Sequence, residues 1–358
     1  MTSFLEMNGV RYSLDRLDEA LRAAPTPFYA DAIQFCRDWI AQRDQFTFHT
    51  SGSTGTPKQI SFTRSQLITS ARLSAEALNL QAGDTALVCL DTRLIAGAMM
   101  LVRSMVVGMN ILLEQPSANP VQGTSSPMHF AALVPYQVVS ILQTNPASLQ
   151  RIKTVIIGGA PLQASSLAVL KTFTNHVYAT YGMTETITHI ALQQLSGKTP
   201  QEHFHALNTI SLSTDNRECL VIHAPHLGQP PIITNDRVQL IDDKTFVWMG
   251  RIDRVINSGG KKIQPEYIEQ IVESLLGNQG LNNRFFVAGL PDPLLGESVT
   301  LFIEGILARD VQDHMLKALE SRLTRHGAPK SIICLEQFNE TASQKVNRLA
   351  TIRNTSKK

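Results

Sequence analysis

Net charge and cysteine are both scarce in this chain. Among its 358 residues, 32 Lys and Arg nearly balance 30 Asp and Glu, which leaves a net charge of +2. A charge so close to zero gives no electrostatic case for binding nucleic acid or an anionic membrane surface. We therefore expect small molecules as partners. A hydrophobic content of 43% is enough for a full core, and the length predicts a globular protein of two or three domains.

The few cysteines lie far apart and form no Cys-x-x-Cys pair: Cys36, Cys89, Cys219 and Cys334. This spacing argues against a disulfide framework and a zinc site, and it fits buried thiols in a reducing compartment. Residues 1–21 alternate charged and apolar residues and lack the uninterrupted apolar core of a secretory signal. We therefore expect a cytoplasmic location.

One long apolar run occupies residues 94–113, LIAGAMMLVRSMVVGMNILL, and by length it could cross a bilayer. Arg103 near its middle would cost about 2.5–3.5 kcal/mol in a membrane span, and no basic cluster flanks the segment. We predict instead a buried helix over 96–107, a stop at Gly108 and an apolar strand over 109–114. Arg103 then becomes a buried cation that needs an anionic partner.

Strand-length apolar runs alternate with helical patterns in the first half of the chain, which is typical of layered α/β folds. From about Thr209, short β-like pieces follow one another and predict a small β-rich subdomain that closes the larger one. These pieces are 218–225, 231–236, 237–243 and 245–250. After Asp253, the chain order is a helical pattern over 265–276, strand patterns over 284–291 and 298–305, and a second helical pattern over 311–323. We therefore predict an α/β N-terminal domain over 1–252 and a small α+β C-terminal domain over 253–358.

A loop rich in glycine and hydroxyl groups, TSGSTGTPK over 50–58, follows a strand-like segment over 44–49. Lys58 does not directly follow a glycine, so the loop is not a Walker A motif. Glycines nevertheless let backbone N–H groups approach a phosphate, and hydroxyl groups add donors. From this loop alone, a phosphate-binding loop and a flexible surface turn both stay open.

Six motifs in order resemble those of the acyl-adenylate-forming superfamily, which includes acyl-CoA synthetases, non-ribosomal adenylation domains and luciferases. They are TSGSTGTPK at 50–58, GGAPL at 158–162, YGMTET at 181–186, TNDRVQL at 234–240, GRIDRVINSGGKKIQPEYIE at 250–269 and SQKVNR at 343–348. The resemblance spans most of the chain. It implies a large N-terminal domain, a mobile C-terminal domain, and the use of ATP, Mg²⁺ and CoA.

By this resemblance, the nucleotide is held by Thr50, Ser51, Gly52, Ser53, Thr54, Gly55, Thr56, Lys58, Gly158, Gly159, Ala160, Pro161, Tyr181, Gly182, Met183, Asp236 and Arg251. Tyr181 is expected to stack on the adenine, whereas Asp236 and Arg251 bind the ribose hydroxyls. In the same way, Thr184 contacts phosphate oxygens and Glu185 holds Mg²⁺, a hard cation that prefers oxygen ligands.

Lys345 is expected to offset the negative charge of the attacking carboxylate and the α-phosphate. The family pattern also makes Asp253 the hinge between the two domains. The C-terminal domain would turn after adenylation and bring the NSGGKK loop to the site. The CoA route would then include Ser258, Gly259, Gly260 and Lys261.

The spacing from Gly97 to Arg103 resembles that of the o-succinylbenzoate:CoA ligases of menaquinone synthesis. That acid carries two carboxylates, and Arg103 would bind the one that is not activated. An internal salt bridge or carbonyl contacts would be a competing explanation for Arg103. His189 is a further candidate for the acid pocket by position.

The chain also departs from the family pattern in three places. Fewer residues precede Thr50 than in most relatives, so we expect the N-terminal subdomain to be missing or minimal. Thr92 and Arg93 stand where many acyl-CoA synthetases have a Phe-His pair, and Gln344 stands where relatives usually have glycine.

The resulting hypothesis is an ATP- and Mg²⁺-dependent acid:thiol ligase, with o-succinylbenzoate as the favoured acid. Alternatives are an aryl-acid or other acyl-CoA ligase, an enzyme that loads a carrier protein, and a non-catalytic nucleotide-binding scaffold. Retention of Lys58, Glu185, Asp236, Arg251 and Lys345 argues against the scaffold. The close-set histidines at 203, 205, 223 and 226 lack Cys or carboxylate partners at metal-site intervals, so we expect no metal site there.

Overall fold

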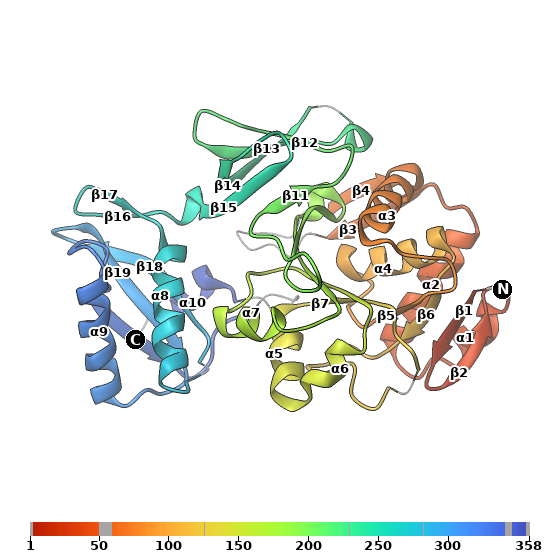
Figure 1. Ribbon diagram of the computed structural model, residues 1–358, viewed down its shortest axis with the longest axis horizontal. Coiled ribbons are helices and arrows are strands. Elements are labelled where there is room, and N and C mark those ends of the chain that lie inside the picture. The colour runs from red at the N-terminus through yellow and green to blue at the C-terminus, as the bar shows by residue number, and fades with distance from the viewer. Residues whose placement is uncertain are drawn as a thin grey trace.

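The computed structural model describes residues 3–49, 59–124, 126–228, 230–281, 283–340 and 346–355. These residues form a 13-stranded sheet, a five-stranded sheet and a two-stranded hairpin. The two larger sheets occupy opposite ends of the molecule (Figure 1). The hairpin pairs β3 (Gln45–His49) with β4 (Gln59–Thr63), and it flanks the glycine-rich segment 50–58.

One half of the large sheet is parallel. Its strands, in spatial order, are β1 (Phe4–Met7), β6 (Asn110–Leu113), β5 (Thr85–Val88), β7 (Phe130–Leu133), β8 (Thr154–Ile157) and β9 (His176–Gly182). Every residue of β5, β7 and β8 is buried, because helices cover both faces of the sheet. Successive residues of β5 therefore enter different cores, Ala86 and Val88 on one face and Leu87 on the other.

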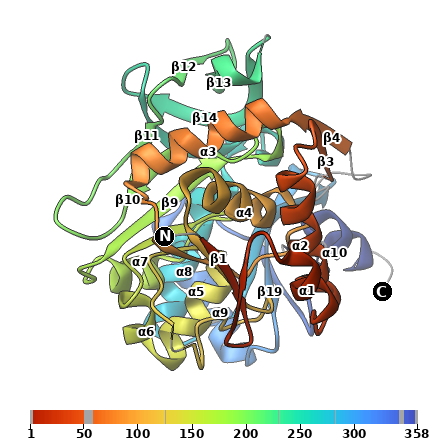
Figure 2. The same cartoon turned by 90° about the vertical axis from the view of Figure 1, so that its right-hand side faces the viewer.

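The helices divide between these two faces. One face packs against α1 (Leu17–Arg22), α2 (Pro27–Ile40), α3 (Arg64–Leu78) and α4 (Ile95–Val107). The other packs against α5 (Pro135–Thr144), α6 (Pro146–Gln150) and α7 (Ala164–Leu170). Figure 2 shows α3 and α4 stacked on the first face.

The predicted helix in the long apolar run is confirmed as α4. Gly108 follows it in the left-handed conformation, with φ 81°, and β6 begins at Asn110. Residues 97–104 are all buried, Arg103 included. None of the described helices combines the length and apolar character that a membrane span needs.

The other half of the large sheet is antiparallel. It runs through β10 (His189–Gln194), β11 (Phe204–Ala206), β15 (Thr245–Arg251), β14 (Ile232–Leu240), β13 (Cys219–His223) and β12 (Ser211–Thr214), while β2 (Val10–Ser13) forms the opposite edge. The strands after Thr209, which the sequence predicted as a small β-rich subdomain, belong to the same sheet as the parallel strands. They continue the large sheet through β11, although Figure 1 shows them standing above the parallel half.

The prediction of two separate strands over 231–243 is wrong. The polar residues in the middle of this segment suggested a break, but β14 is continuous and absorbs the irregularity as a register shift between Arg237 and Val238. A bulge of this kind leaves the flanking residues paired with β15. The overall fold is mixed α/β.

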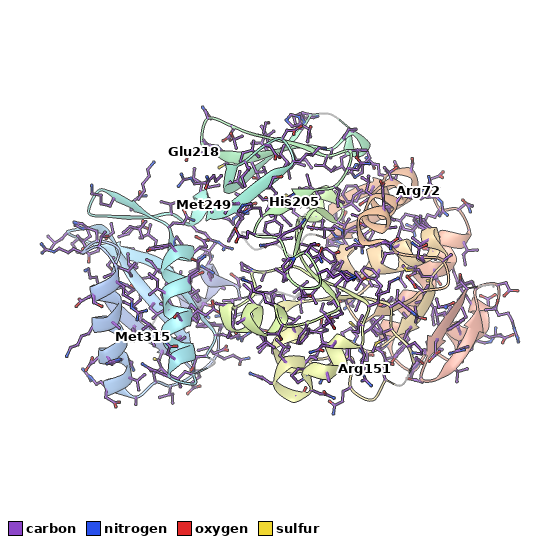
Figure 3. All side chains as sticks on the ribbon, in the orientation of Figure 1. Arg72, Arg151, His205, Glu218, Met249 and Met315 are labelled. Atoms are coloured by element: carbon purple, nitrogen blue, oxygen red, sulfur yellow. The ribbon has the colours of Figure 1, made fainter. Side chains whose placement is uncertain are left out.

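The remaining elements build the five-stranded sheet. Its strands are β16 (Ile256–Ser258), β17 (Lys261–Ile263), β18 (Phe285–Asp292), β19 (Gly296–Glu304) and β20 (Ser331–Leu335). The helices α8 (Pro265–Asn278) and α9 (Arg309–Arg322) cover one face, where Met315 is fully buried (Figure 3). On the other face, Phe286, Phe302 and Phe338 pack near α10 (Arg348–Thr355). This sheet has its own core, and we propose that it belongs to a domain that begins at Asp253.

Helices α7 and α8 bring the two parts of the molecule into contact (Figure 1). Glu273 of α8 is half-buried, and the backbone N–H groups of Ala164 and Ser165, in the first turn of α7, interact with its carboxylate. Burial raises the pKa of Glu273, and these N–H groups oppose that shift. The residues just before α7 belong to the GGAPL motif.

Candidate active site

The site follows from the order of the parallel strands. Strand β6 lies on one side of β5 and β7 lies on the other, so the direction of winding reverses between β5 and β7. In open α/β sheets, ligands bind beyond the carboxyl ends of the strands at such a reversal. A cavity of about 300 Å³ lies there. Its lining includes Leu90 and Asp91 after β5, and Leu133 and Val134 at the end of β7.

Several of the predicted site residues meet at this cavity. Its lining includes Arg103, Gly158, Gly159, Gly182, Met183, Thr184 and His189. Glu185 follows Thr184 and is exposed, as are Ala160 and Pro161 after the two glycines. Residues from α4, from the end of β8 and from the β9–β10 turn thus share one site.

Two of the glycines are required by close packing or by backbone geometry. A Cβ atom on Gly182 would lie 2.5 Å from the carbonyl oxygen of Thr188, closer than real Cβ atoms approach backbone. Gly159 has φ 93°, which disfavours other residues. These positions let the main chain pass close to the cavity.

The turn that carries Thr184 and Glu185 contains a strained residue. Ile187 is fully buried with φ 66° and ψ −59°, an unusual conformation for a β-branched side chain. The N–H of Thr188 donates to the carbonyl of Thr186 at 2.7 Å, which closes a γ-turn. Such strain costs on the order of 1–3 kcal/mol and persists where surrounding contacts impose it. The sequence pattern gave no sign of it.

Arg103 is a buried cation that no carboxylate neutralises in the part of the chain that the structure describes. Its side chain is 1% exposed. One NH₂ group donates to the hydroxyl of Thr188, the other lies 3.7 Å from Met100 Sδ, and Nε has no partner among the described residues. Burial lowers the pKa of Arg103 to about 9, so the guanidinium is still charged at pH 7. Neither an internal salt bridge nor a bonded carbonyl occurs at Arg103 within the described ranges.

His189 lies beside this arginine and is 5% exposed. Its Nδ1 is 3.3 Å from the Thr188 hydroxyl, and its Nε2 has no hydrogen-bond partner among the described residues. Burial, and then the charge of Arg103, hold the pKa of His189 well below 6.5. The imidazole is therefore neutral at pH 7.

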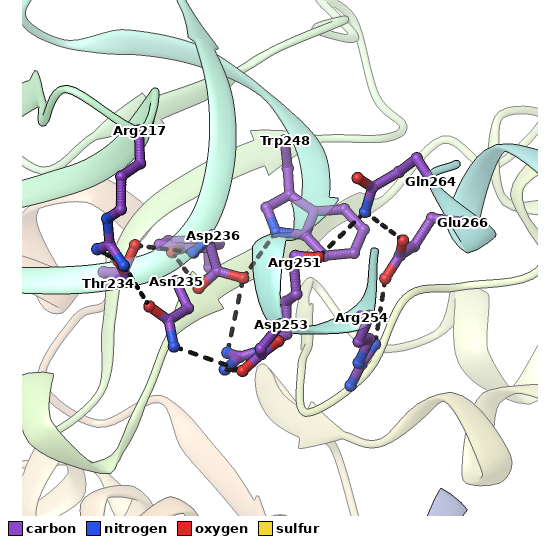
Figure 4. Close-up of polar contacts among 11 residues, drawn as sticks. Arg217, Thr234, Asn235, Asp236, Trp248, Arg251, Asp253, Arg254, Gln264 and Glu266 are labelled. Carbon is purple, nitrogen blue, oxygen red and sulfur yellow. Dashed lines mark hydrogen bonds and ion pairs between the residues drawn. The ribbon is translucent and has the colours of Figure 1, made fainter. Parts of the chain in front are cut away.

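A second group of predicted residues surrounds Asp236 on β14 (Figure 4). Tyr181 donates its hydroxyl to Asp236 Oδ2 at 2.9 Å, and Trp248 donates its indole N–H to Oδ1 at 3.0 Å. Burial and the charge of Asp236 raise the pKa of Tyr181, which keeps the phenol protonated as a donor. Sequence reasoning did not single out Trp248, whose apolar surroundings marked it as an ordinary strand residue.

The aromatic ring of Tyr181 packs edge-on against Phe246, with ring centroids 5.1 Å apart. Phe204 makes a similar contact at 6.1 Å. This packing fixes the ring next to Gly182 at the edge of the cavity. Its stacking on an adenine stays a prediction.

Arg251 stands between two carboxylates (Figure 4). It makes two hydrogen bonds to Asp253, at 2.9 and 2.6 Å, and its NH1 group is 3.8 Å from Asp236. Asn235 donates to the same Asp253 at 3.4 Å. The predicted ribose residue and the predicted hinge residue therefore share one arginine.

The loop predicted for the CoA route forms the tip of a β-hairpin. Ser258 pairs with Lys261, and the two glycines between them have φ 55° and 74°, as a two-residue type I′ turn requires. Ser258 is buried, whereas Gly259, Gly260 and Lys261 are exposed.

Two of the predicted segments lie outside the described residues. They are 50–58, which includes Thr50 and Lys58, and 341–345, which includes Gln344 and Lys345. The strand β3 ends at His49, which lines the cavity and precedes the first segment directly. Arg93 is exposed and pairs with Asp91 at 2.7 Å. No cluster of three or more metal-ligating side chains occurs among the described residues.

Comparison with known families decides the relationship. A model of AMP-binding enzymes matches residues 16–243, which is well over half of the chain. The chain belongs to the AMP-binding enzyme family. The resemblance inferred from the six motifs is therefore confirmed, and the cavity of this family member lies within the matched region.

Curated relatives and solved structures agree with that membership. The 2-succinylbenzoate–CoA ligase of Enterococcus faecalis is 24% identical over 333 residues, which cover 83% of this chain and 67% of the relative. An acyl-CoA synthetase (AMP-forming)/AMP-acid ligase II-like protein from Dyadobacter fermentans is 36% identical, with a TM-score of 0.61 and coverage of 92% and 95%. The o-succinylbenzoate coenzyme A synthetase of Bacillus subtilis, solved with ATP and magnesium ion, is 21% identical, with a TM-score of 0.71 and coverage of 86% and 69%.

Proposed function

We propose that this protein is an ATP- and Mg²⁺-dependent acid:CoA ligase, and that its acid is o-succinylbenzoate, as in menaquinone biosynthesis. It would first join the acid to AMP with release of pyrophosphate, and then transfer the acyl group to the thiol of CoA. Family membership supports the reaction type. The observation that carries the choice of acid is Arg103, a charged side chain buried at the cavity without a carboxylate partner among the described residues.

A buried cation favours an acid with two carboxylates. A monocarboxylic fatty acid would leave Arg103 uncompensated, whereas the second carboxylate of o-succinylbenzoate would neutralise it. The apolar lining, which includes Ile95, Ala132 and Ile156, suits an aromatic ring. The names of the curated relatives point to the same acid.

Adenylation brings a carboxylate to an α-phosphate, so the protein must offset repulsion between two anions. Thr184 at the cavity would donate its hydroxyl to phosphate oxygens. Glu185 is exposed beside it and fits a Mg²⁺ ion that takes its other ligands from phosphates and water. When bound there, Mg²⁺ would neutralise phosphate charge. Asp236 is held by two donors and keeps lone pairs for the ribose hydroxyls.

We further propose that Lys345 serves only the first half-reaction. The C-terminal domain would turn at Asp253 after adenylation, withdraw Lys345 and bring the Gly259–Gly260 turn to the site. In a Lys345→Ala variant, formation of the acyl-adenylate should be lost while thiolysis of a supplied acyl-adenylate continues. Equal loss of both steps in a folded variant would refute this division.

The first test is a product analysis. The purified protein is mixed with ATP, Mg²⁺ and o-succinylbenzoate, with and without CoA, and products are followed by mass spectrometry beside benzoic and fatty acids. We expect a CoA thioester with o-succinylbenzoate and little with the other acids. A thioester with another aryl acid would correct the substrate alone.

Two further outcomes would change the proposed function itself. Acyl-adenylate without thioester would indicate a carrier protein as the acceptor. No AMP from any acid would indicate a nucleotide-binding scaffold.

A further inference from the structure

Three side chains at the cavity, Arg103, Thr188 and His189, form a hydrogen-bonded row. A guanidinium has donors and no acceptor, so the Thr188 hydroxyl must accept the hydrogen bond from Arg103. The hydroxyl hydrogen of Thr188 then remains free to donate. His189 Nδ1 lies 3.3 Å from that oxygen, and it either accepts this hydrogen or donates its own hydrogen to the second lone pair of the oxygen. Because the Arg103 cation polarises the hydroxyl that accepts from it, onward donation from Thr188 to Nδ1 is favoured, and the row then runs from Arg103 through Thr188 to His189.

This direction fixes the tautomer of the histidine. If Thr188 donates to Nδ1, then Nδ1 is an acceptor and carries no hydrogen. A neutral imidazole must then carry its hydrogen on Nε2. The low pKa of His189 agrees with the neutral form. The Nε2–H group is thus a buried donor without a partner among the described residues.

Arg103 has a matching feature. Its Nε–H group is also buried and without a partner in the described ranges. An unsatisfied buried donor costs roughly 1–3 kcal/mol, so two beside one cavity call for a ligand that accepts hydrogen bonds. Both residues line the cavity, and so does Thr188 between them.

We propose that Thr188 is a positioning and specificity-determining residue, which directs the Arg103 guanidinium and fixes His189 as the Nε2–H tautomer. The acid pocket thereby presents an N–H group from each residue to one accepting group of the substrate. Thr188 does not itself touch the reacting atoms. For the identity of the substrate, this inference rests on the proposed function.

The local backbone supports this role for Thr188. The γ-turn at Ile187 places Thr188 directly before β10, and the hydroxyl of Thr186 donates to the Thr188 carbonyl at 2.7 Å. Gly182 packs against the same carbonyl from β9. A strained turn held by these contacts gives the Thr188 hydroxyl a fixed position between two buried groups.

The first experiment is ¹⁵N NMR of the histidine side chains in the full-length protein. A His189→Gln variant identifies the signals of His189. We expect the Nε2–H tautomer in the wild-type protein, without any substrate. In Thr188→Val, which keeps the shape and removes the hydroxyl, we expect a mixture of tautomers. Thr188→Ser keeps the hydroxyl and should restore the wild-type signal.

The second experiment measures KM for the acid that the product analysis identifies. Thr188→Val should raise this KM about tenfold, since one hydrogen bond to a charged group is lost. The KM for ATP should change by less than about twofold, and Thr188→Ser should stay within about threefold of wild type. A purely structural role for Thr188 would alter both KM values and kcat together.

The outcomes separate this inference from the proposed function. An Nδ1–H tautomer in the wild-type protein, or a Thr188→Val variant with unchanged tautomer and KM, would overturn the role of Thr188. Loss of activity toward every acid would instead overturn the proposed function, while the NMR result would still decide the tautomer. If Thr188→Val fails to fold, the wild-type signal and Thr188→Ser decide the question.

Discussion

Two arginines in different parts of the molecule differ in whether carboxylates neutralise their charge. Arg284, directly before β18 of the five-stranded sheet, makes hydrogen bonds to Glu304 at 2.5 and 2.7 Å and to Glu340 at 2.5 Å. Arg103 is more deeply buried and has no such partner among the described residues. An isolated buried charge costs several kcal/mol, whereas a paired one recovers much of that cost. The difference teaches that the charge of Arg284 is compensated within the fold, whereas the charge of Arg103 is left for the acid that we propose as its ligand.

Replacing Arg103 should therefore affect binding most and stability least. In Arg103→Met, we expect KM for the acid to rise at least about 100-fold, because the charge partner of its second carboxylate is lost. The midpoint of thermal unfolding should stay the same or rise, since an uncompensated charge leaves the core. Arg72→Met, at an exposed position of α3, is the matched control (Figure 3). A lower midpoint with an unchanged KM would reverse the comparison.

Replacing Arg284 should instead lower stability and leave substrate binding unchanged. Arg284→Met leaves two carboxylates without their cation, and we expect a loss of about 1–3 kcal/mol in the free energy of unfolding, reduced because the arginine is one-third exposed. Urea denaturation measures this loss, and KM for the acid should not change. Arg309→Met at the exposed start of α9 serves as the control. Equal stability of both variants would show that the Arg284 network is dispensable.

The pH dependence sharpens the comparison further. Burial acts to raise the pKa of Glu304, but hydrogen bonds from Arg284 and Phe338 outweigh it and the net pKa is lowered from 4.5. The stabilisation from Glu304 is therefore present above pH 4.5 and is lost as pH falls through the lower folded-state pKa.

In Arg284→Met, burial dominates and should raise the pKa of Glu304 instead. The contribution of Glu304 to stability should then decline as pH rises through 4.5 and above. Denaturation curves from pH 3 to pH 7 give the slope of the free energy of unfolding against pH in the wild-type protein and in Arg284→Met. The same slope in both proteins would show that Arg284 does not control this carboxylate.

The smallest expected effect concerns a carboxylate that has no cation partner in the described ranges. Glu273 of α8 interacts with the first turn of α7, and its Oε1 has no hydrogen-bond partner in the described part of the chain. A carboxylate at a helix N-terminus contributes about 0.3–1 kcal/mol. In Glu273→Gln, the amides of Ala164 and Ser165 should exchange up to about fivefold faster with deuterium. Glu320→Gln, at an exposed position of α9, should leave their exchange unchanged.

Local patterns were enough to predict parts of this fold and site. The helix α4 and its glycine stop follow from a 13-residue apolar segment and one left-handed residue. The motif residues that line the cavity follow from family resemblance. Buried Arg103 followed from its place in the apolar run. These features depend on residues that are close in sequence.

Other features depend on contacts between distant segments and could not be predicted. The bond between Arg103 and Thr188 joins residues 85 positions apart, and no pattern in either segment indicates it. The strain at Ile187 is imposed by packing around the turn. The continuity of β14 was missed because its central Asn235 and Asp236 are polar, although Asp236 is buried and bonded within the sheet.

Because Trp248 donates a hydrogen bond to Asp236, its fluorescence can report on the environment of that carboxylate. The chain has two tryptophans, and the other, Trp39, is buried 3.9 Å beneath the guanidinium of Arg64. Indole emission responds to the polarity and charge around its N–H group. A Trp39→Phe protein would therefore carry one fluorophore, and that fluorophore is bonded to the carboxylate predicted to hold the ribose. Titration with nucleotide could then be followed by fluorescence without any label.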